Sequence, residues 1–398
     1  MIIVTDYILD ILLGLYVYTY PILLNTRTNF VVEVPRPQGF IVSEIINRVS
    51  VNEIYERLAK NDEQTQEIGT YCVFIVKKIN IDTLTLAKKM CSKLFCKTFE
   101  TMGLKETRAI AYQSIVLVGC KKIEKRLSIN DGDVNADAIL WFCSNKEPYL
   151  IHNANKFHIT ILSENPSAIL YIETMLKLLD SYEWYILNFF GYQRFGSRRP
   201  ITHILGKNLI KEDLQGFLNT LCSSSSTHRN MNSLENVLCK SSETNLEKAL
   251  INIANKPLYR RIIELFVNAY QSYLFNKLLS VTWLKLLNTF SITEALKRLK
   301  SDYRYLPLPG YATKASGAIA VLLDEILATE DIDMNSFCLK MLKNMCFYGD
   351  YRESLTKASE VVYNKYKNGI KMTFLLPPGS YATIVLRELL RCTPLLYI

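Results

Sequence analysis

The chain has 398 residues, which is longer than one hydrophobic core usually supports, so two domains are expected. Hydrophobic residues make up 49% and charged residues 21% of the chain, proportions that exclude a disordered protein and indicate a folded globular one. The net charge of +9 favours a polyanionic partner, and some of the 24 tyrosines could stack on unpaired bases, although most aromatic side chains are expected in the core.

The cysteines and histidines do not form a metal-binding pattern. Ten cysteines occur without a C-x-x-C pair, and the four histidines, at positions 152, 158, 203 and 228, have no zinc-type spacing to a cysteine. The sequence therefore predicts no metal site. It shows no convincing signal peptide, so we expect free thiols in a reducing cytosol and a cytoplasmic protein.

An apolar segment, YILDILLGLYVYTYPILL at residues 7–24, raises the question of a membrane anchor. A spanning helix needs about 20 residues with few or no charges. Here Asp10 lies inside the segment, Gly14 and Pro21 interrupt it, and no basic residue precedes it. A buried helix followed by a turn is favoured over an anchor, and no membrane partner is expected.

Apolar periodicities of 2 and 3.6 residues alternate in the first half of the chain. They predict a strand over 71–76, a helix over 81–95, strands over 114–119 and 157–162, and a helix over about 167–187. Asp82 or Thr83 is the expected N-cap of the first helix. The alternation FHITIL places Phe157 and Ile159 on one face of its strand.

The second half of the chain is mostly helical in pattern. A serine-rich loop is expected over 222–233, and a long helix over 258–279. A strand pattern returns at 370–376, followed by PPGSYATIVLRELLR, which predicts a turn that enters a helix. This order indicates a mixed domain with a helical insertion, and the last strand is expected to rejoin the sheet of the first domain.

Four stretches are richer in glycine, aromatic and basic residues than a purely structural role requires. They are GLKETRAIAYQ (103–113), ANKF (154–157), NFFGYQRFGSRRPITH (188–203) and LPPGSYATIVLREL (376–389). None is a Walker loop, a dinucleotide fingerprint, a G-x-S-x-G elbow or H-E-x-x-H. Nucleotide hydrolysis, dinucleotide binding and serine-type catalysis are therefore not indicated.

In this order, the four stretches resemble the TruD family of tRNA pseudouridine synthases, over nearly the whole chain. The family pattern N-[YF]-F-G-x-Q-R-F-G occurs at 188–196, and its ending G-S-[YF]-A-T-x-x-x-R-E-L occurs at 379–389. AYQSYLFN (269–276) and NFVVEV (29–34) are similar to two further family segments. LLGLYVYTYPILL also looks like the family's opening segment, which removes the remaining reason to invoke a membrane.

The resemblance gives a meaning to GLKETRAIAYQ. The catalytic motif of the family is G-x-K-D-x-x-A, in which the aspartate is the catalytic carboxylate. Gly103, Lys105 and Ala109 match this motif, and Glu106 stands in the place of the aspartate. Without this context Glu106 would be read as a solvated charge in a turn. With it, Glu106 is the expected catalytic residue.

Other departures from the family pattern also concentrate at the expected active site. Ala111 replaces the usual threonine of the motif, while Gln113 is kept. The lysine that precedes the family's E-D-F has no clear counterpart, and Arg27 is the nearest base. Asn29 stands where the aspartate of E-D-F would be.

The resemblance implies an α+β fold. The pseudouridine synthase catalytic domain, with a mixed and mainly antiparallel sheet, is expected over residues 1–199 and 366–398, and a mostly helical TRUD insertion domain over 200–365. It further implies a tRNA substrate, a reaction without any cofactor, and a monomer.

The resemblance also implies roles for individual residues. Asn155 and Phe157 are expected to flank the target base, Tyr381 to pack against it, and Lys105 to take part in substrate binding. The residues expected to contact RNA are all basic: Arg27, Lys78, Arg108, Arg194, Arg198 and Arg199. For Arg194, a role in bracing the fold is an equal alternative. Arg198 and Arg199 are expected in an exposed basic loop.

Pseudouridine formation breaks the N-glycosidic bond, rotates the base and rejoins it through carbon. The carboxylate acts either as a nucleophile at the sugar or as a base on its C2′ proton. Glutamate adds one methylene, and a misplacement of about 1 Å can cost on the order of 100-fold in rate. Either the enzyme is impaired or its backbone has adapted. The target by resemblance is uridine 13, uridine 35 or both, and the alternative is an RNA-binding homologue that has lost most catalysis.

Overall fold

The structure is a computed structural model that describes residues 4–21, 31–60, 69–196, 199–223, 238–239, 255–342 and 345–398. The chain forms two compact units. Residues 27–185 and 356–397 make up one of them, here called the sheet unit, and residues 1–26, 186–355 and 398 make up the other, the helical unit. The domain boundaries expected from the sequence stay a prediction.

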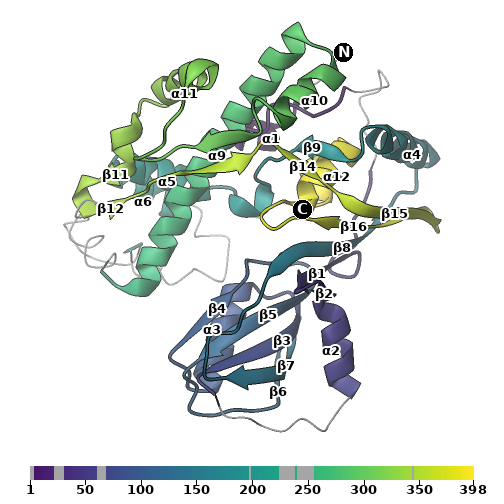
Figure 1. Cartoon of the computed structure of the whole chain (residues 1–398), viewed down its shortest axis with the longest axis vertical. Coiled ribbons are helices and arrows are strands. Elements are labelled where there is room, and N and C mark those ends of the chain that lie inside the picture. Colours follow the sequence, from purple (N-terminus) through teal and green to yellow (C-terminus); the bar gives the residue numbers. More distant parts are fainter. Residues whose placement is uncertain are drawn as a thin grey trace. The chain divides into compact units, whose positions relative to one another are not determined.

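Among the described residues, the sheet unit is built on a ten-stranded sheet (Figure 1). The strands follow the order β15-β16-β8-β1-β5-β3-β7-β6, with β2 beside β1 and β4 beside β5. The pair β1–β5 is parallel and the other pairs are antiparallel. The strands are β1 (Phe40–Ile46), β2 (Val49–Ser50), β3 (Tyr71–Ile79), β4 (Thr98–Thr101), β5 (Ile110–Val118), β6 (Arg126–Asp131), β7 (Val134–Ser144), β8 (His152–Leu162), β15 (Ser359–Tyr366) and β16 (Gly369–Leu376). The expected α+β fold with a mixed, mainly antiparallel sheet is confirmed.

The helices of the sheet unit are α2 (Val51–Lys60), α3 (Thr83–Lys93), α4 (Pro166–Ser181) and α12 (Ala382–Leu390). Helices α3 and α2 cover opposite faces of β3 (Figure 1). Phe74 and Val76 of β3 pack in one core cluster with residues of α3, whereas Ile75 packs in another with residues of α2. Because successive side chains of a strand point to opposite faces, the apolar run YCVFIV contributes to both layers.

The returning strand at the C-terminus was expected in the first domain's sheet, and the structure confirms this. β16 pairs with β8 in antiparallel register, with Phe374 opposite Phe157. The N-cap of α3 is Asp82, whose carboxylate accepts a hydrogen bond from the backbone N–H of Thr85.

One helix boundary was wrong. The helix expected to reach residue 187 ends at Ser181, because Glu183 and Trp184 have positive φ angles of 53° and 59°, and β9 (Tyr185–Leu187) follows.

The helical unit is dominated by α9 (Pro257–Thr289), which spans 33 residues. Its other helices include α1 (Ile8–Leu12), α5 (Thr202–Ile210), α6 (Leu214–Cys222), α10 (Ile292–Lys300) and α11 (Gly317–Thr329), with short strands β10 (Tyr305–Leu308), β11 (Cys338–Leu339), β12 (Met345–Cys346) and β13 (Asp350–Glu353). On α9, Val267, Tyr270 and Leu274 are fully buried, at the spacing of one helix face. The serine-rich loop expected over 222–233 lies almost entirely outside the described residues.

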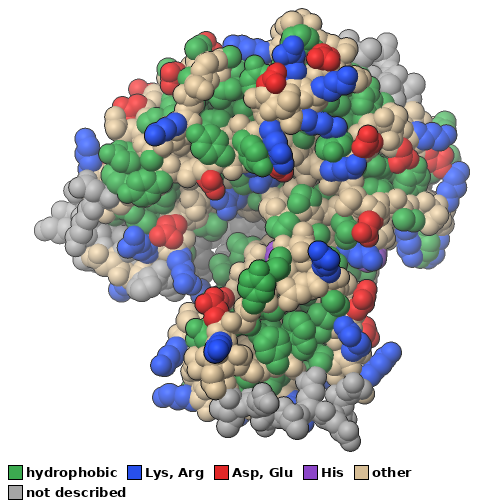
Figure 2. All heavy atoms as spheres, viewed as in Figure 1, with side chains coloured by type: hydrophobic (Ala, Val, Ile, Leu, Met, Phe, Trp, Pro, Cys, Tyr) green, Lys and Arg blue, Asp and Glu red, His purple; other side chains and the backbone are tan. Residues whose placement is uncertain are grey.

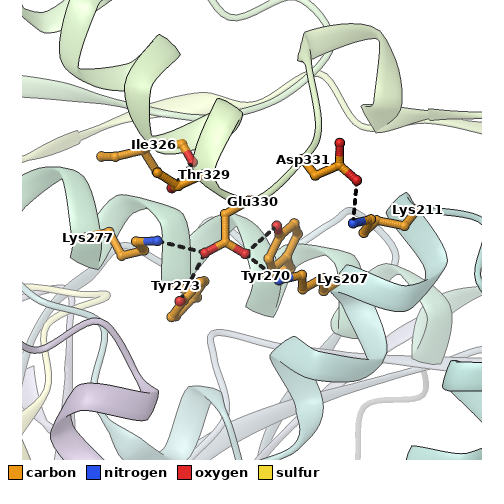
Figure 3. Close-up of polar contacts among 9 residues, drawn as sticks. All are labelled: Lys207, Lys211, Tyr270, Tyr273, Lys277, Ile326, Thr329, Glu330 and Asp331. Atoms are coloured by element: carbon orange, nitrogen blue, oxygen red, sulfur yellow. Dashed lines mark hydrogen bonds and ion pairs between the residues drawn. The ribbon is translucent and has the colours of Figure 1, made fainter.

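A buried carboxylate ties three helices of this unit together (Figure 3). Glu330, directly after α11, accepts hydrogen bonds from Lys207 of α5 and Lys277 of α9, each at 2.7 Å. The hydroxyls of Tyr270 and Tyr273 donate to the same carboxylate at 3.2 Å. Burial would raise the pKa of Glu330, but the two lysines outweigh it and lower the pKa to about 2.

Up to residue 21, where the described part of the N-terminal apolar segment ends, its only helix is the five-residue α1. Asp10 inside it is fully buried, and its carboxylate accepts hydrogen bonds from the hydroxyls of Thr5 at 2.9 Å and Tyr192 at 2.5 Å. Ile8 and Leu12 are exposed, so the helix is less buried than expected. In the part of the chain that the structure describes, no helix is both long and apolar enough to span a bilayer.

The expectation of free thiols is wrong for most cysteines. Within the described residues, the disulfides are Cys72–Cys143, Cys96–Cys120, Cys222–Cys239 and Cys338–Cys346, while Cys91 and Cys392 are free. Cys72 of β3 and Cys143 of β7 are direct cross-strand partners. Pairings of this kind follow from strand register, which spacing along the sequence does not show.

The charged side chains are spread over the surface. Figure 2 shows lysines and arginines interspersed with aspartates and glutamates across the visible face, without one dominant basic field. On this face the basic residues are therefore distributed, and contacts with a polyanion there must come from particular basic residues.

Candidate functional site

The motif GLKETRAIAYQ forms the loop before β5 and the first residues of that strand. Gly103 has a φ of +146°, a conformation that side chains other than glycine rarely adopt. It therefore fixes the turn from which Lys105 and Glu106 follow. The motif thus contains a glycine that the backbone requires at position 103, and it also supplies the charged side chains of Lys105 and Glu106.

Lys78 of β3 holds this loop from inside the unit. Its side chain is fully buried, and its ammonium donates to the carbonyls of Ile81 and Glu106 at 2.8 Å and of Lys105 at 3.4 Å. Burial lowers the pKa of Lys78 to about 8, against the charges of Glu106 and Asp82. The expected contact of Lys78 with RNA is corrected accordingly, because this ammonium is shielded from solvent and uses its three N–H donors on the backbone.

A second connection to the loop runs through Thr83 and Gln113. The hydroxyl of Thr83 donates to Oε1 of Gln113 at 3.0 Å and accepts from the backbone N–H of Lys105 at 3.1 Å. Gln113 lies in β5 and is fully buried. Gln113 therefore has a structural role: it orients the Thr83 hydroxyl, which accepts the backbone N–H of Lys105.

The side chain of Lys105 points into the protein. Its Nζ lies 2.8 Å from Oε1 of Glu44 in β1, and the side chains are only 7% and 1% exposed. The other oxygen of Glu44 accepts a hydrogen bond from the backbone N–H of Ser114 at 2.8 Å. The positive charge of Lys105 is therefore balanced by a buried carboxylate that the sequence analysis did not single out.

Asn155 and Phe157 lie two residues apart on β8 and share one face of the strand. In the strand register, Asn155 is the partner of Glu44, and its Oδ1 lies 3.1 Å from Nε2 of His152. Burial is the main cause that lowers the pKa of His152, and the charge of Lys105 adds to it. The strand thus places Asn155 close to the Lys105–Glu44 pair.

Phe157 belongs to an aromatic cluster. Its ring stacks on Phe374 of β16 with centroids 5.4 Å apart, and the ring of Phe40 meets it edge-on at 6.0 Å. Asn155 and Phe157 are each only 7% exposed. Tyr381, at the N-cap of α12, is half-buried. The ring of Phe157 is therefore positioned by two neighbouring rings.

The carboxylate of Glu106 is half-buried, and its Oε2 is a buried atom without a hydrogen-bond partner among the described residues. A buried oxygen of this kind is unusual, since buried polar atoms are nearly always paired. Two residues further on, Arg108 is exposed to solvent. The loop thus presents a carboxylate oxygen with free acceptor capacity beside an exposed base.

The charge of Glu106 acts on Arg36, a base that the sequence analysis missed. Burial lowers the pKa of Arg36 to about 10, the negative charge of Glu106 opposes that effect, and the charge of Arg108 adds to it. Nothing in the sequence around Arg36 sets it apart. For Glu44, a charge at a buried position of FIVSEII was a usable signal, because charged residues are rarely buried unless they are paired.

The remaining basic residues expected to contact RNA belong to the helical unit or lie outside the described residues. Arg194 donates from Nε to the hydroxyl of Ser272 at 3.0 Å and lines a pocket of about 770 Å³. Arg199 is half-buried and donates to the carbonyls of Thr220 and Leu221 in the last turn of α6. Arg199 is thus less exposed than expected, while Arg27 and Arg198 lie outside the described residues.

In the described ranges, no cluster of three or more histidine, cysteine, aspartate or glutamate side chains is arranged to hold a metal ion. In the sheet unit, Lys105 of the motif loop pairs with Glu44 of β1, and Glu44 lies opposite Asn155 of β8. Such a site offers acid–base or nucleophilic chemistry by a carboxylate beside a flat apolar surface.

Comparison with known proteins places this chain in a class of RNA-modifying isomerases. The sequence model of the family "tRNA pseudouridine synthase D (TruD)" matches residues 35–263 and 288–389, and the chain belongs to this family.

Similar proteins cover almost the whole chain. The probable tRNA pseudouridine synthase D 2 of Methanococcus maripaludis is 29% identical over 388 residues, which cover 88% of this chain and 93% of that protein. The probable tRNA pseudouridine synthase D of Nanoarchaeum equitans is 28% identical over 389 residues, with 89% and 97% covered. The crystal structure of a putative TruD from Methanosarcina mazei matches with a TM-score of 0.57 at 22% identity, over 98% of this chain and 99% of that chain. This last likeness shows the fold.

Proposed function

We propose that this protein isomerises a uridine of tRNA to pseudouridine and that Glu106 is the catalytic carboxylate. Membership of the TruD family supports the reaction. The observation that carries the assignment of Glu106 is its buried Oε2 atom, which has no hydrogen-bond partner in the described residues, although Lys78 and Thr83 hold the backbone of the same loop. Such an oxygen keeps its full capacity to accept a hydrogen bond from a bound substrate.

The proposed reaction is an isomerisation that balances without an oxidant or a reductant. The bond from N1 of uracil to C1′ of the ribose breaks, the detached base turns, and a bond forms from C5 to C1′. The proton on C5 leaves, and N1 gains one proton. The carboxylate of Glu106 acts on this sequence either as a nucleophile at C1′ or as a base at C2′.

Asn155, Phe157 and Tyr381 are the residues that we propose to hold the target base. The target uridine must leave its stack to enter such a site. The ring of Phe157 is supported by Phe374 and Phe40, so it offers a rigid apolar surface for a base. Because Asn155 lies on the same face of β8, its amide N–H groups are well placed for the polar edge of uracil.

Arg108 is the residue of the site most suited to meet a phosphate, because it is exposed and adjoins Glu106. We propose further RNA contacts by Arg27, Arg194, Arg198 and Arg199, and a contribution of Lys105 to the substrate site through its pair with Glu44. The target is uridine 13, uridine 35 or both, as in the family. The cytoplasmic location and the monomeric state stay predictions.

The test is pseudouridine mapping on tRNA that has been transcribed without modifications and incubated with the purified protein. The wild type should introduce pseudouridine at one or both target positions, and Glu106→Gln should introduce none while it still binds the tRNA. Binding by both proteins without any pseudouridine would instead identify an RNA-binding homologue. Mapping at a different uridine would correct the target and leave the reaction in place.

A further inference from the structure

A groove of the sheet unit lies between α3 and β6, and the proposed catalytic site does not use it. Among the described residues β6 pairs only with β7, so it forms an edge of the sheet. The groove has a volume of about 750 Å³ and is lined by one side of α3 and by residues 128–131 of β6. Ile129 is the single apolar residue of this lining, and its side chain is buried.

The side of α3 that lines the groove is a basic stripe. It consists of Thr85, Lys88, Lys89, Ser92 and Lys93. Spacings of three and four residues place these side chains on one face of the helix, and all three lysines are exposed. The opposite face packs into the core through Leu86 and Met90. Because α3 contains no acidic residue, its exposed face presents only ammonium and hydroxyl groups to the groove.

Two contacts join the helix to β6 without using up the positive charge. Nζ of Lys93 donates to the carbonyl of Ser128 at 3.1 Å, and Nζ of Lys89 lies 3.7 Å from Oδ2 of the exposed Asp131. An ammonium has three N–H donors, so both lysines keep further donors. Lys88 has no ion-pair partner in the part of the chain that the structure describes. The stripe therefore carries more positive charge than the acid in the groove can balance.

The stripe begins beside the loop of Glu106. α3 starts at Thr83, whose hydroxyl accepts a hydrogen bond from the backbone N–H of Lys105 at 3.1 Å. At a rise of 1.5 Å per residue, Lys93 lies about 15 Å further along the helix axis. Lys89 and Lys93 are about 6 Å apart along this axis, so they can meet different phosphates of one strand.

We propose that the groove between α3 and β6 binds the phosphate backbone of the tRNA, outside the site that holds the target uridine. This inference rests on the proposed tRNA substrate. Lysines bind phosphates as point charges, and hydroxyl and amide groups such as those of Ser92 and Asn130 add hydrogen bonds. A protein partner fits less well, because the lining offers no exposed apolar side chain for the centre of an interface. The groove supplies affinity and orientation, since phosphate contacts carry no base information.

The contribution of the stripe is tested by replacing Lys88 and Lys93 together with glutamine, which keeps the pair of Lys89 with Asp131. Binding of the full-length protein to an unmodified tRNA transcript is measured over a series of salt concentrations. The slope of log K against log salt concentration should fall by about 1.4 to 1.8, because each lost phosphate contact lowers it by about 0.7 to 0.9.

The matched control is the pair Arg57→Gln and Lys60→Gln on α2, which removes the same charge from exposed positions of the same unit. This variant should keep the wild-type slope. An unchanged slope in the groove variant would overturn the proposal. Equal reductions in both variants would also overturn it, because they would show a general effect of net charge.

Lysine footprinting locates the contact in the wild-type protein and needs no enzymatic activity. The protein is acetylated with and without tRNA, and mass spectrometry measures the modification of each lysine. Bound tRNA should slow the acetylation of Lys88 and Lys93 severalfold and leave the exposed Lys177 of α4 unchanged. Equal acetylation of Lys88 and Lys93 in both samples would show that the stripe is solvated surface. Protection without pseudouridine formation would refute the proposed function and uphold the groove, and pseudouridine formation without protection would do the reverse.

Discussion

Oε1 of Glu44 in β1 lies 2.8 Å from Nζ of Lys105 in the loop before β5, and both side chains are shielded from solvent. The two residues are 61 positions apart in the sequence, so the pair forms only when the sheet is complete. It joins the motif loop to the strand that also pairs with β8. The ion pair therefore links the integrity of the sheet to the placement of the neighbouring Glu106.

Removing one member of this pair should be costly. Glu44→Gln leaves the ammonium of Lys105 buried without a counterion, and we expect a loss of about 3–5 kcal/mol in the free energy of unfolding, measured by urea denaturation. Glu173→Gln is the matched control, because Glu173 pairs with the largely exposed Lys365 and should cost less than about 1 kcal/mol. Equal effects of the two substitutions would show that the Glu44–Lys105 pair does not stabilise the fold.

Substitutions of Glu106 separate the two interpretations of the longer side chain. Glu106→Gln should abolish pseudouridine formation and leave tRNA binding nearly intact, because the volume of the side chain is kept. Glu106→Asp should raise the rate, by up to about 100-fold, if the extra methylene misplaces the carboxylate. It should lower the rate if the pocket has adapted to glutamate. Isomerisation at the wild-type rate in Glu106→Gln would rule out the catalytic assignment.

Lys78 should control the rigidity of the motif loop. Lys78→Met removes the donor to three carbonyls, so amide hydrogen exchange over residues 103–109 should accelerate while exchange in β6 stays unchanged. The pKa of Lys78 is about 8 in the folded protein and near 10.5 when exposed. Between these values the unfolded chain binds more protons, so stability relative to Lys78→Met should rise with pH, by up to about 3 kcal/mol. A constant difference from pH 8 to pH 10.5 would contradict the depressed pKa.

Glu330 should make the helical unit sensitive to acid. Its pKa is lowered from 4.5 to about 2 by Lys207 and Lys277, so its contribution is complete above pH 4.5 and is lost as the pH falls towards 2. The loss is on the order of 3 kcal/mol. Between pH 4.5 and pH 2, the melting temperature of Glu330→Gln should therefore fall less than that of the wild type in a series of thermal melts. If the melting temperatures of variant and wild type fell by the same amount from pH 5 to pH 2, this prediction would be wrong.

Arg108 should contribute one phosphate contact. Arg108→Ala should weaken tRNA binding and reduce the slope of log K against log salt concentration by about 0.7 to 0.9. Arg57→Ala, a change of an equally exposed arginine on α2, provides the comparison and should leave the slope in place. An unchanged slope in Arg108→Ala would show that this side chain does not contact a phosphate of the tRNA.

The strands and caps that the sequence predicted correctly share one property: each is specified by residues close together along the chain. The apolar run of β3, the alternation in β8 and the N-cap Asp82 all depend on neighbours within a few residues. The motif containing Glu106 was likewise recognisable as a local pattern. Its position in a loop before a strand followed from that pattern.

The supports of the site could not be predicted in the same way. Glu44 of β1 meets Lys105, 61 residues further along the chain, only because β1 and β5 take up a particular register. The disulfide between Cys72 and Cys143 depends on the same kind of alignment. Local periodicity gives the faces of a strand but not its neighbour or its offset.

β1 lies between β5 and β8, so it is the single spacer between the loop of Glu106 and the strand of Asn155 and Phe157. A residue inserted into β1 would advance one neighbour by about 3.3 Å against the other and would turn Glu44 to the opposite face. The spacing between the loop of Glu106 and the strand of Asn155 and Phe157 thus depends on the seven residues of β1. Efforts to retune this enzyme for a different nucleoside geometry should begin with β1, since its register sets that spacing.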